Sequence, residues 1–152
     1  MFRKSAVLLL FVAFFGTACG DDDPVAPPEA SLVGTWNVMA LELVSNTNPN
    51  VQVDLIRLGA TATLVLQQNN DFAFSLTWAN PPGGVWGTDI TEDGTWSSTD
   101  VLTLTTSPTN TWQFEASLNG DSLILTEADT SYDFDGDGNV EPASFNMDLA
   151  RD

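Results

Sequence analysis

The chain has 152 residues, with 21 acidic residues against four basic ones and a formal net charge of −17. A surface this acidic repels the phosphates of nucleic acids, so we expect no nucleic-acid partner. The sequence contains no histidine and a single cysteine. Because histidine most often serves as general base or transition-metal ligand near neutral pH, we expect no enzyme. A carboxylate-based enzyme stays a weaker alternative, on the pairs Glu92–Asp93 and Glu127–Asp129 that arise by chance in so acidic a chain.

Residues 1–18 have the order of a secretory signal peptide. Two of the basic residues, Arg3 and Lys4, directly precede the apolar stretch Ala6–Phe15, and three aspartates follow soon after it. The stretch is shorter than the roughly 20 apolar residues that a transmembrane helix needs. We therefore expect export of the chain rather than a helical membrane span.

The end of this segment, Gly16-Thr17-Ala18-Cys19, resembles the lipobox of bacterial lipoproteins, in which the cysteine is acylated and becomes the first residue after cleavage. The resemblance implies that Cys19 anchors the protein to a membrane through lipid. Each buried acyl methylene contributes about 0.8 kcal/mol, so several acyl chains make the attachment durable. The alternatives are an ordinary signal peptide cut after Ala18, which leaves a free thiol, and a cysteine that pairs with a partner chain.

Residues 19–30 are expected to form a flexible acidic and proline-rich linker behind the lipidated cysteine. The segment has few apolar side chains to bury, and its three prolines favour extended geometry. Acidic residues just after the cysteine resemble the sorting signals of some lipoproteins. We expect a bacterial envelope protein held at the outer membrane, with its periplasmic or surface side left open.

Residues 31–152 have the pattern of one all-β domain. Short β-rich runs are broken by turn residues, and no window of a dozen residues shows helical periodicity. In the run Phe72–Trp78 apolar side chains alternate with small or polar ones, as in a half-buried strand. Asn119-Gly120 is a strong signal for a two-residue hairpin. The expected strands are Leu32–Val44, Ala60–Gln67, Phe72–Trp78, Trp86–Ser97, Val101–Thr106, Thr111–Ser117, Ser122–Glu127 and Ala143–Arg151.

The short connections between these runs favour antiparallel neighbours. Strands that meander in this way avoid exposed edges most simply by closing into a barrel. We therefore predict an eight-stranded antiparallel up-and-down β-barrel that is a monomer, with an open β-sandwich as the alternative.

Both ends of the domain resemble the lipocalin family. Gly34-Thr35-Trp36 at the head of the first strand is similar to the Gly-x-Trp signature of lipocalins, and Arg151 is similar to the arginine that packs across its tryptophan. The resemblance implies a lipocalin-like barrel over residues 31–152. It also implies that the Arg151 guanidinium stacks on the Trp36 indole and closes one end of the barrel, with a structural role rather than a ligand-binding one.

An eight-stranded barrel either fills its interior with side chains or keeps room for one small ligand. The long link Ser45–Gly59 would cap the open end, with Leu55 and Ile56 over a ligand and Arg57 supplying a cation. A second loop, Ala79–Gly84, would line the same rim. The aromatic candidates for contact with the ligand are Phe72, Phe74, Trp78 and Trp112. The alternative is that these residues only pack the core and that Arg57 only offsets nearby acids.

The segment Asp133–Glu141 has the spacing of an EF-hand calcium loop. Carboxylates at alternating positions would converge on one cation, and the sixth position is a glycine that permits the sharp bend. The twelfth position is Ser144 instead of the usual bidentate glutamate, and no helices flank the loop. A solvated Asp-Gly turn is the alternative. The expected calcium ligands are Asp133, Asp135, Asp137, Asn139 and Glu141.

These observations favour an envelope-anchored lipocalin-like lipoprotein that binds or carries a small hydrophobic molecule. The alternative from another class is a structural or interaction lipoprotein whose filled barrel takes no small ligand. The presence or absence of interior space separates the two.

Overall fold

The computed structural model describes residues 27–79, 89–106 and 110–152, without the side chains of residues 110 and 127–129. The signal peptide, Cys19, most of the linker, most of the rim loop Ala79–Gly84 and Trp86 therefore lie outside the described residues. One short helix and nine strands make up the rest: α1 Glu29–Leu32, β1 Gly34–Ser45, β2 Gln52–Asp54, β3 Ala60–Leu66, β4 Asp71–Trp78, β5 Ile90–Ser98, β6 Leu102–Thr106, β7 Asn110–Asn119, β8 Ser122–Tyr132 and β9 Glu141–Arg151.

Eight of the strands form a closed antiparallel barrel. From β3 onward each strand pairs with the next one along the chain, β1 pairs with β3, and β1 also pairs with β9 over nearly its whole length. Each of these eight strands therefore has a paired neighbour on both sides over part of its length, which reduces the unpaired edge that an open sheet presents. The predicted up-and-down barrel is confirmed, and the open sandwich is excluded.

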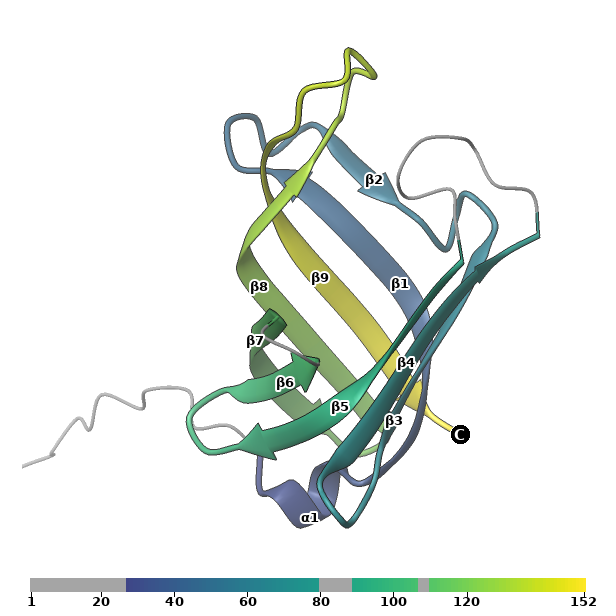
Figure 1. Cartoon of the computed structure of the whole chain (residues 1–152), viewed down its shortest axis with the longest axis vertical. Coiled ribbons are helices and arrows are strands. Elements are labelled where there is room, and N and C mark those ends of the chain that lie inside the picture. Colours follow the sequence, from purple (N-terminus) through teal and green to yellow (C-terminus); the bar gives the residue numbers. More distant parts are fainter. Residues whose placement is uncertain (1–26, 80–88, 107–109) are drawn as a thin grey trace, which may run out of the picture.

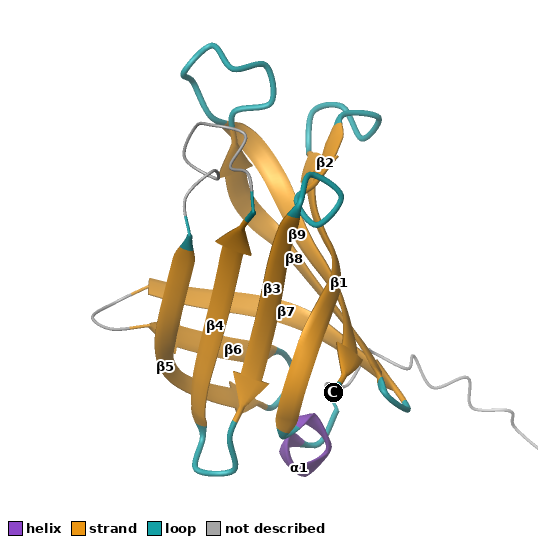
Figure 2. Cartoon of the chain, turned by 90° about the vertical axis from the view of Figure 1, so that its right-hand side faces the viewer, coloured by secondary structure: helices purple, strands orange, loops and turns teal. Residues whose placement is uncertain are grey.

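The two ends of the barrel differ in what covers them (Figure 1). Helix α1 and the β3–β4 turn lie at one end, which we call the closed end. The β1–β2 and β8–β9 connections rise from the opposite end, which we call the mouth, and Figure 2 shows the same arrangement from the side. Within the described residues no helix has the length and apolar character needed to cross a bilayer.

The barrel wall is irregular between β1 and β3. The first part of β1 pairs with β3, from Gly34 opposite Leu66 to Asn37 opposite Thr63, whereas residues 42–44 pair with the short strand β2. A bulge between Val38 and Ala40 marks the change. The chain after β1 therefore returns along the gap that opens between β1 and β3, and the sequence pattern did not predict β2.

Inward-facing apolar side chains form a single core. The alternation of β4 places Phe72, Phe74 and Leu76 inside, as the sequence predicted. Gly94 allows β5 to lie tightly against β6, because a Cβ atom at this position would collide with the carbonyl oxygen of Thr105. Because Gly94 has no side chain, the barrel wall can bend sharply at this point.

Candidate functional site

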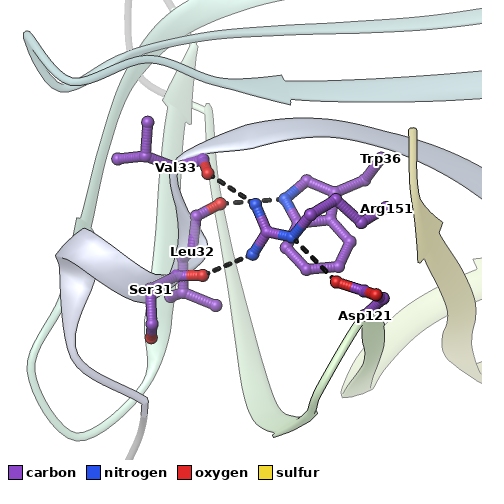
Figure 3. Close-up of polar contacts among 6 residues, drawn as sticks. All are labelled: Ser31, Leu32, Val33, Trp36, Asp121 and Arg151. Carbon is purple, nitrogen blue, oxygen red and sulfur yellow. Dashed lines mark hydrogen bonds and ion pairs between the residues drawn. The ribbon is translucent and has the colours of Figure 1, made fainter.

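The closed end is held by Trp36 and Arg151, which come from the two ends of the domain (Figure 3). The guanidinium carbon of Arg151 lies 4.2 Å from the centre of the Trp36 ring, and Trp36 is fully buried. The indole Nε1 donates a hydrogen bond of 2.8 Å to the carbonyl oxygen of Leu32 in α1. Arg151 donates from Nη1 to the Val33 carbonyl at 2.8 Å and from Nη2 to the Ser31 carbonyl at 2.7 Å. The structure thus brings the two residues together as a stacked pair.

Gly34 is required beside this pair. Its backbone has φ +150°, a conformation that side chains disfavour, and a Cβ atom would lie 2.6 Å from Nη1 of Arg151. The glycine of the Gly-x-Trp segment therefore makes room for the arginine. The hydrogen-bond donors of Trp36 and Arg151 are used by carbonyl groups of the chain, and the two side chains cover this end of the barrel. The arrangement is that of a structural pair rather than of a binding site.

Inner-face side chains are closely packed, with small local differences in their exposed surface. Trp36, Leu66 and Phe72 have at most 2% of their surface exposed. Further along the inner face, Ala62 keeps 7% and Phe145 8% of their surface accessible. Leu41, Leu43 and Leu76 on the same inner face are fully buried, so the accessible surface is confined to a few side chains.

Aromatic side chains line part of the interior. The ring of Phe74 meets the ring of Trp112 edge to face, with 5.9 Å between the ring centres. Trp78 stands on the same face of β4 as Phe74, and its Nε1 is enclosed by protein and has no hydrogen-bond partner among the residues that the structure describes. An enclosed donor without a partner is costly, and a ligand acceptor would remove that cost. Of the predicted contact residues, Phe74 and Trp112 are in contact, Trp78 shares their inner face, and Phe72 is buried to 2% exposure.

Glu92 is an inner-face residue that the sequence analysis did not assign to the site. It lies opposite Phe74 across the β4–β5 pair and is partly buried, whereas Asp93 lies opposite Ala73 on the other face and is exposed. Neighbouring residues of a strand point to opposite faces, so this pair does not form a catalytic carboxylate dyad. The signal was present in the sequence: Glu92 shares the alternation of Ile90 and Trp96. The side chains of Glu127 and Asp129 lie outside the described residues.

The link between β1 and β3 forms part of the barrel wall. Leu55 is buried, and its backbone N–H donates to the Leu41 carbonyl at 2.8 Å, which fixes the link along β1. Ile56 packs against the core, but Arg57 is exposed. Arg57 lines a hollow of about 270 Å³ together with Glu42, which alternates with the buried Leu41 and Leu43 on β1. The structure thus places Leu55 and Ile56 with the interior and Arg57 apart from it.

The acidic loop lies at the mouth, between β8 and β9. Carboxylate oxygens from Asp133, Asp135, Asp137 and Glu141 all lie within 4.8 Å of one another. Asp133 accepts hydrogen bonds from the backbone of Gly136 at 2.7 Å and of Gly138 at 2.9 Å. These bonds order the loop into the tight shape that calcium loops require.

The residues next to the acidic cluster join it to a neighbouring loop and shift two pKa values. Ser144, at the twelfth position of the motif, donates a hydrogen bond to Asn46 on the β1–β2 loop at 2.8 Å, so it joins two loops at the mouth. The backbone N–H of Asn139, followed by its side-chain amide, lowers the pKa of Asp137. Burial, and to a smaller extent the charge of Asp133, raises the pKa of Tyr132. The cluster matches calcium in its negative charge and in its oxygen atoms, which are the ligand atoms that Ca²⁺ prefers.

Comparison with protein-family models, with curated proteins and with solved structures finds no match to this chain.

Proposed function

We propose that the protein is a lipid-anchored, lipocalin-like lipoprotein of the bacterial envelope, whose barrel binds a small hydrophobic molecule. The observation that carries the proposal is the aromatic inner face, on which Phe74 meets Trp112 edge to face and Ala62 and Phe145 keep 7% and 8% of their surface accessible. The enclosed Trp78 Nε1 without a partner supports it. Binding sites of this kind combine apolar walls with a few polar groups.

The position of the first described residues supports an anchor at the closed end. Ser98, at the end of β5, donates from its side chain to the Pro27 carbonyl at 3.0 Å and from its backbone to Glu29 at 3.2 Å. Residues 27–30 are thereby fixed to the barrel close to α1. The chain from Cys19 to Pro27 spans at most about 25–30 Å when extended. A lipid on Cys19 would hold the closed end toward the membrane and leave the mouth free.

A substitution on the inner face tests the binding proposal. Ala62→Leu adds volume where the interior has accessible surface, and Thr63→Leu adds a similar side chain on the opposite face of β3. The probe is dodecanol, titrated against the fluorescence of the tryptophans. We expect Ala62→Leu to weaken dodecanol binding with little loss of stability, while Thr63→Leu leaves binding unchanged.

The same variants test the alternative of a filled barrel. Extra methylenes in a well-packed core cost about 1–3 kcal/mol of stability. A chain that takes up no dodecanol, and whose Ala62→Leu variant loses stability in that range, has a filled interior and is a structural or interaction lipoprotein. Native mass spectrometry of protein purified from its own envelope would show the acyl chains on Cys19 and any ligand that accompanies the barrel.

Calcium binding by the acidic loop stays a prediction. Four converging carboxylates and the EF-hand-like spacing support it. Bound calcium would stiffen the β8–β9 hairpin at the mouth rather than take part in chemistry, and its test is given in the Discussion.

A further inference from the structure

Glu92 places a carboxylate on the inner face of the barrel. It lies opposite Phe74, whose ring meets Trp112, so apolar and aromatic surface adjoins the charged residue. Glu92 is partly buried, and within the part of the chain that the structure describes it has no hydrogen-bond or ion-pair partner. A charge withdrawn from water is costly unless an opposite charge or donors compensate it.

Within residues 27–79, 89–106 and 110–152, no basic side chain can serve as that partner. After Lys4 the sequence contains only two basic residues, Arg57 and Arg151. Arg151 is held at the closed end by its stack on Trp36 and its bonds to backbone carbonyls, and Arg57 is exposed. An anionic ligand headgroup would therefore meet a carboxylate and no cation inside the barrel. A cationic headgroup would meet a carboxylate and aromatic faces, which also attract cations.

We propose that the barrel selects hydrophobic molecules that carry an ammonium group, with Glu92 as the counter-ion of that group. The inference rests on the proposed function and names the ligand class of the same interior. The apolar part of the ligand would lie against Ala62 and Phe145, the inner-face residues that keep some accessible surface, and the ammonium group would lie near Glu92 and the ring of Phe74. The acidic surface would add to the selection by concentrating cations around the mouth.

Three probes with the same tail test this proposal: dodecylammonium, dodecanol and dodecanoate. The protein is the full-length chain with Cys19→Ser, so that no acyl chain or detergent competes with the probes, and binding is followed by tryptophan fluorescence near neutral pH. We expect dodecylammonium to bind about tenfold more tightly than dodecanol, equal to about 1.4 kcal/mol, and dodecanoate to bind most weakly.

Glu92→Gln should lower the affinity for dodecylammonium to that for dodecanol and leave dodecanol binding unchanged. Retained dodecanol binding shows that the variant is folded. Asp93→Asn is the matched control, because it removes the same charge from the neighbouring exposed position on the opposite face. This control should keep the preference for dodecylammonium. High salt should weaken the effect of the surface charges more than the effect of the partly buried Glu92.

The outcomes separate this inference from the function on which it rests. If dodecanol binds but dodecylammonium binds no more tightly, or if Glu92→Gln keeps the preference, the ammonium selectivity is wrong and the hydrophobic carrier stands. If Asp93→Asn abolishes the preference as fully as Glu92→Gln does, general surface charge accounts for it and Glu92 is not the counter-ion. If none of the three probes binds, the proposed carrier function itself fails.

Discussion

Replacement of Arg151 by alanine should be the most damaging loss of a single charged side chain in the barrel. The arginine stacks on Trp36 at 4.2 Å and donates hydrogen bonds of 2.8 Å and 2.7 Å to the carbonyls of Val33 and Ser31. These contacts tie the last strand to the segment that precedes the first. Without them the cap of the closed end, including α1, would be held by the buried Leu32, the Trp36 hydrogen bond to its carbonyl and the bonds from Ser98.

The size of the effect follows from these contacts. A hydrogen bond from a charged donor contributes about 1.5–3 kcal/mol, and a cation over an indole adds about 0.5–2 kcal/mol. The Arg151 side chain is 29% exposed, so water replaces part of each contact, and the 3.6 Å ion pair with Asp121 counts for little because Asp121 is 86% exposed. We expect Arg151→Ala to lower the free energy of unfolding by about 2–4 kcal/mol.

Urea unfolding followed by tryptophan fluorescence measures this loss as a lower midpoint with an unchanged slope. Arg57→Ala is the matched control, because it removes the same charge from an exposed side chain and surface substitutions usually change stability by less than about 0.5 kcal/mol. If Arg151→Ala costs no more than Arg57→Ala, the stacked pair does not stabilise the closed end and our account of it is wrong.

Three further predictions concern Gly34 and the acidic loop. Gly34→Ala should destabilise the barrel by about 1–3 kcal/mol through its strained φ and its clash with Arg151, and part of that cost should vanish in an Arg151→Ala background; additive costs would refute the clash. Calcium should raise the melting temperature, and a chelator should reverse the rise. Asp135→Asn should abolish this response, whereas Asp148→Asn, at an exposed position of β9, should keep it. An equal response in both variants would exclude the loop as the calcium site. Absorbance titration of Tyr132, the only tyrosine, in a chelator should show a higher pKa in the folded chain than in urea. Because the unfolded chain then loses this proton first, stability should decline as pH rises through the unfolded pKa, and equal midpoints in both states would contradict the burial of this side chain.

Much of the fold was readable from the sequence because a strand with one buried face imposes an alternation of period two. The run Phe72–Trp78 shows it directly, and the structure places its apolar residues inside. The same rule applies to Glu92, which shares the alternation of Ile90 and Trp96, but the sequence analysis considered it only as a pair with its neighbour Asp93. The strand β2 was not predictable, because its three residues form no alternation and pair only where β1 has left β3.

The sequence by itself determined the barrel, since hydrophobic alternation and short connections leave few other ways to satisfy backbone hydrogen bonds. It also determined which residue types were available, including the scarcity of basic side chains. Only the tertiary structure decided which of them meet. The contact of Arg151 with the carbonyls of Ser31 and Val33, and the place of Glu92 beside Phe74 and Trp112, depend on closure of the barrel, which joins residues far apart in the chain. Such contacts leave no local pattern in the sequence, because the residues that make them are close in space but far apart along the chain.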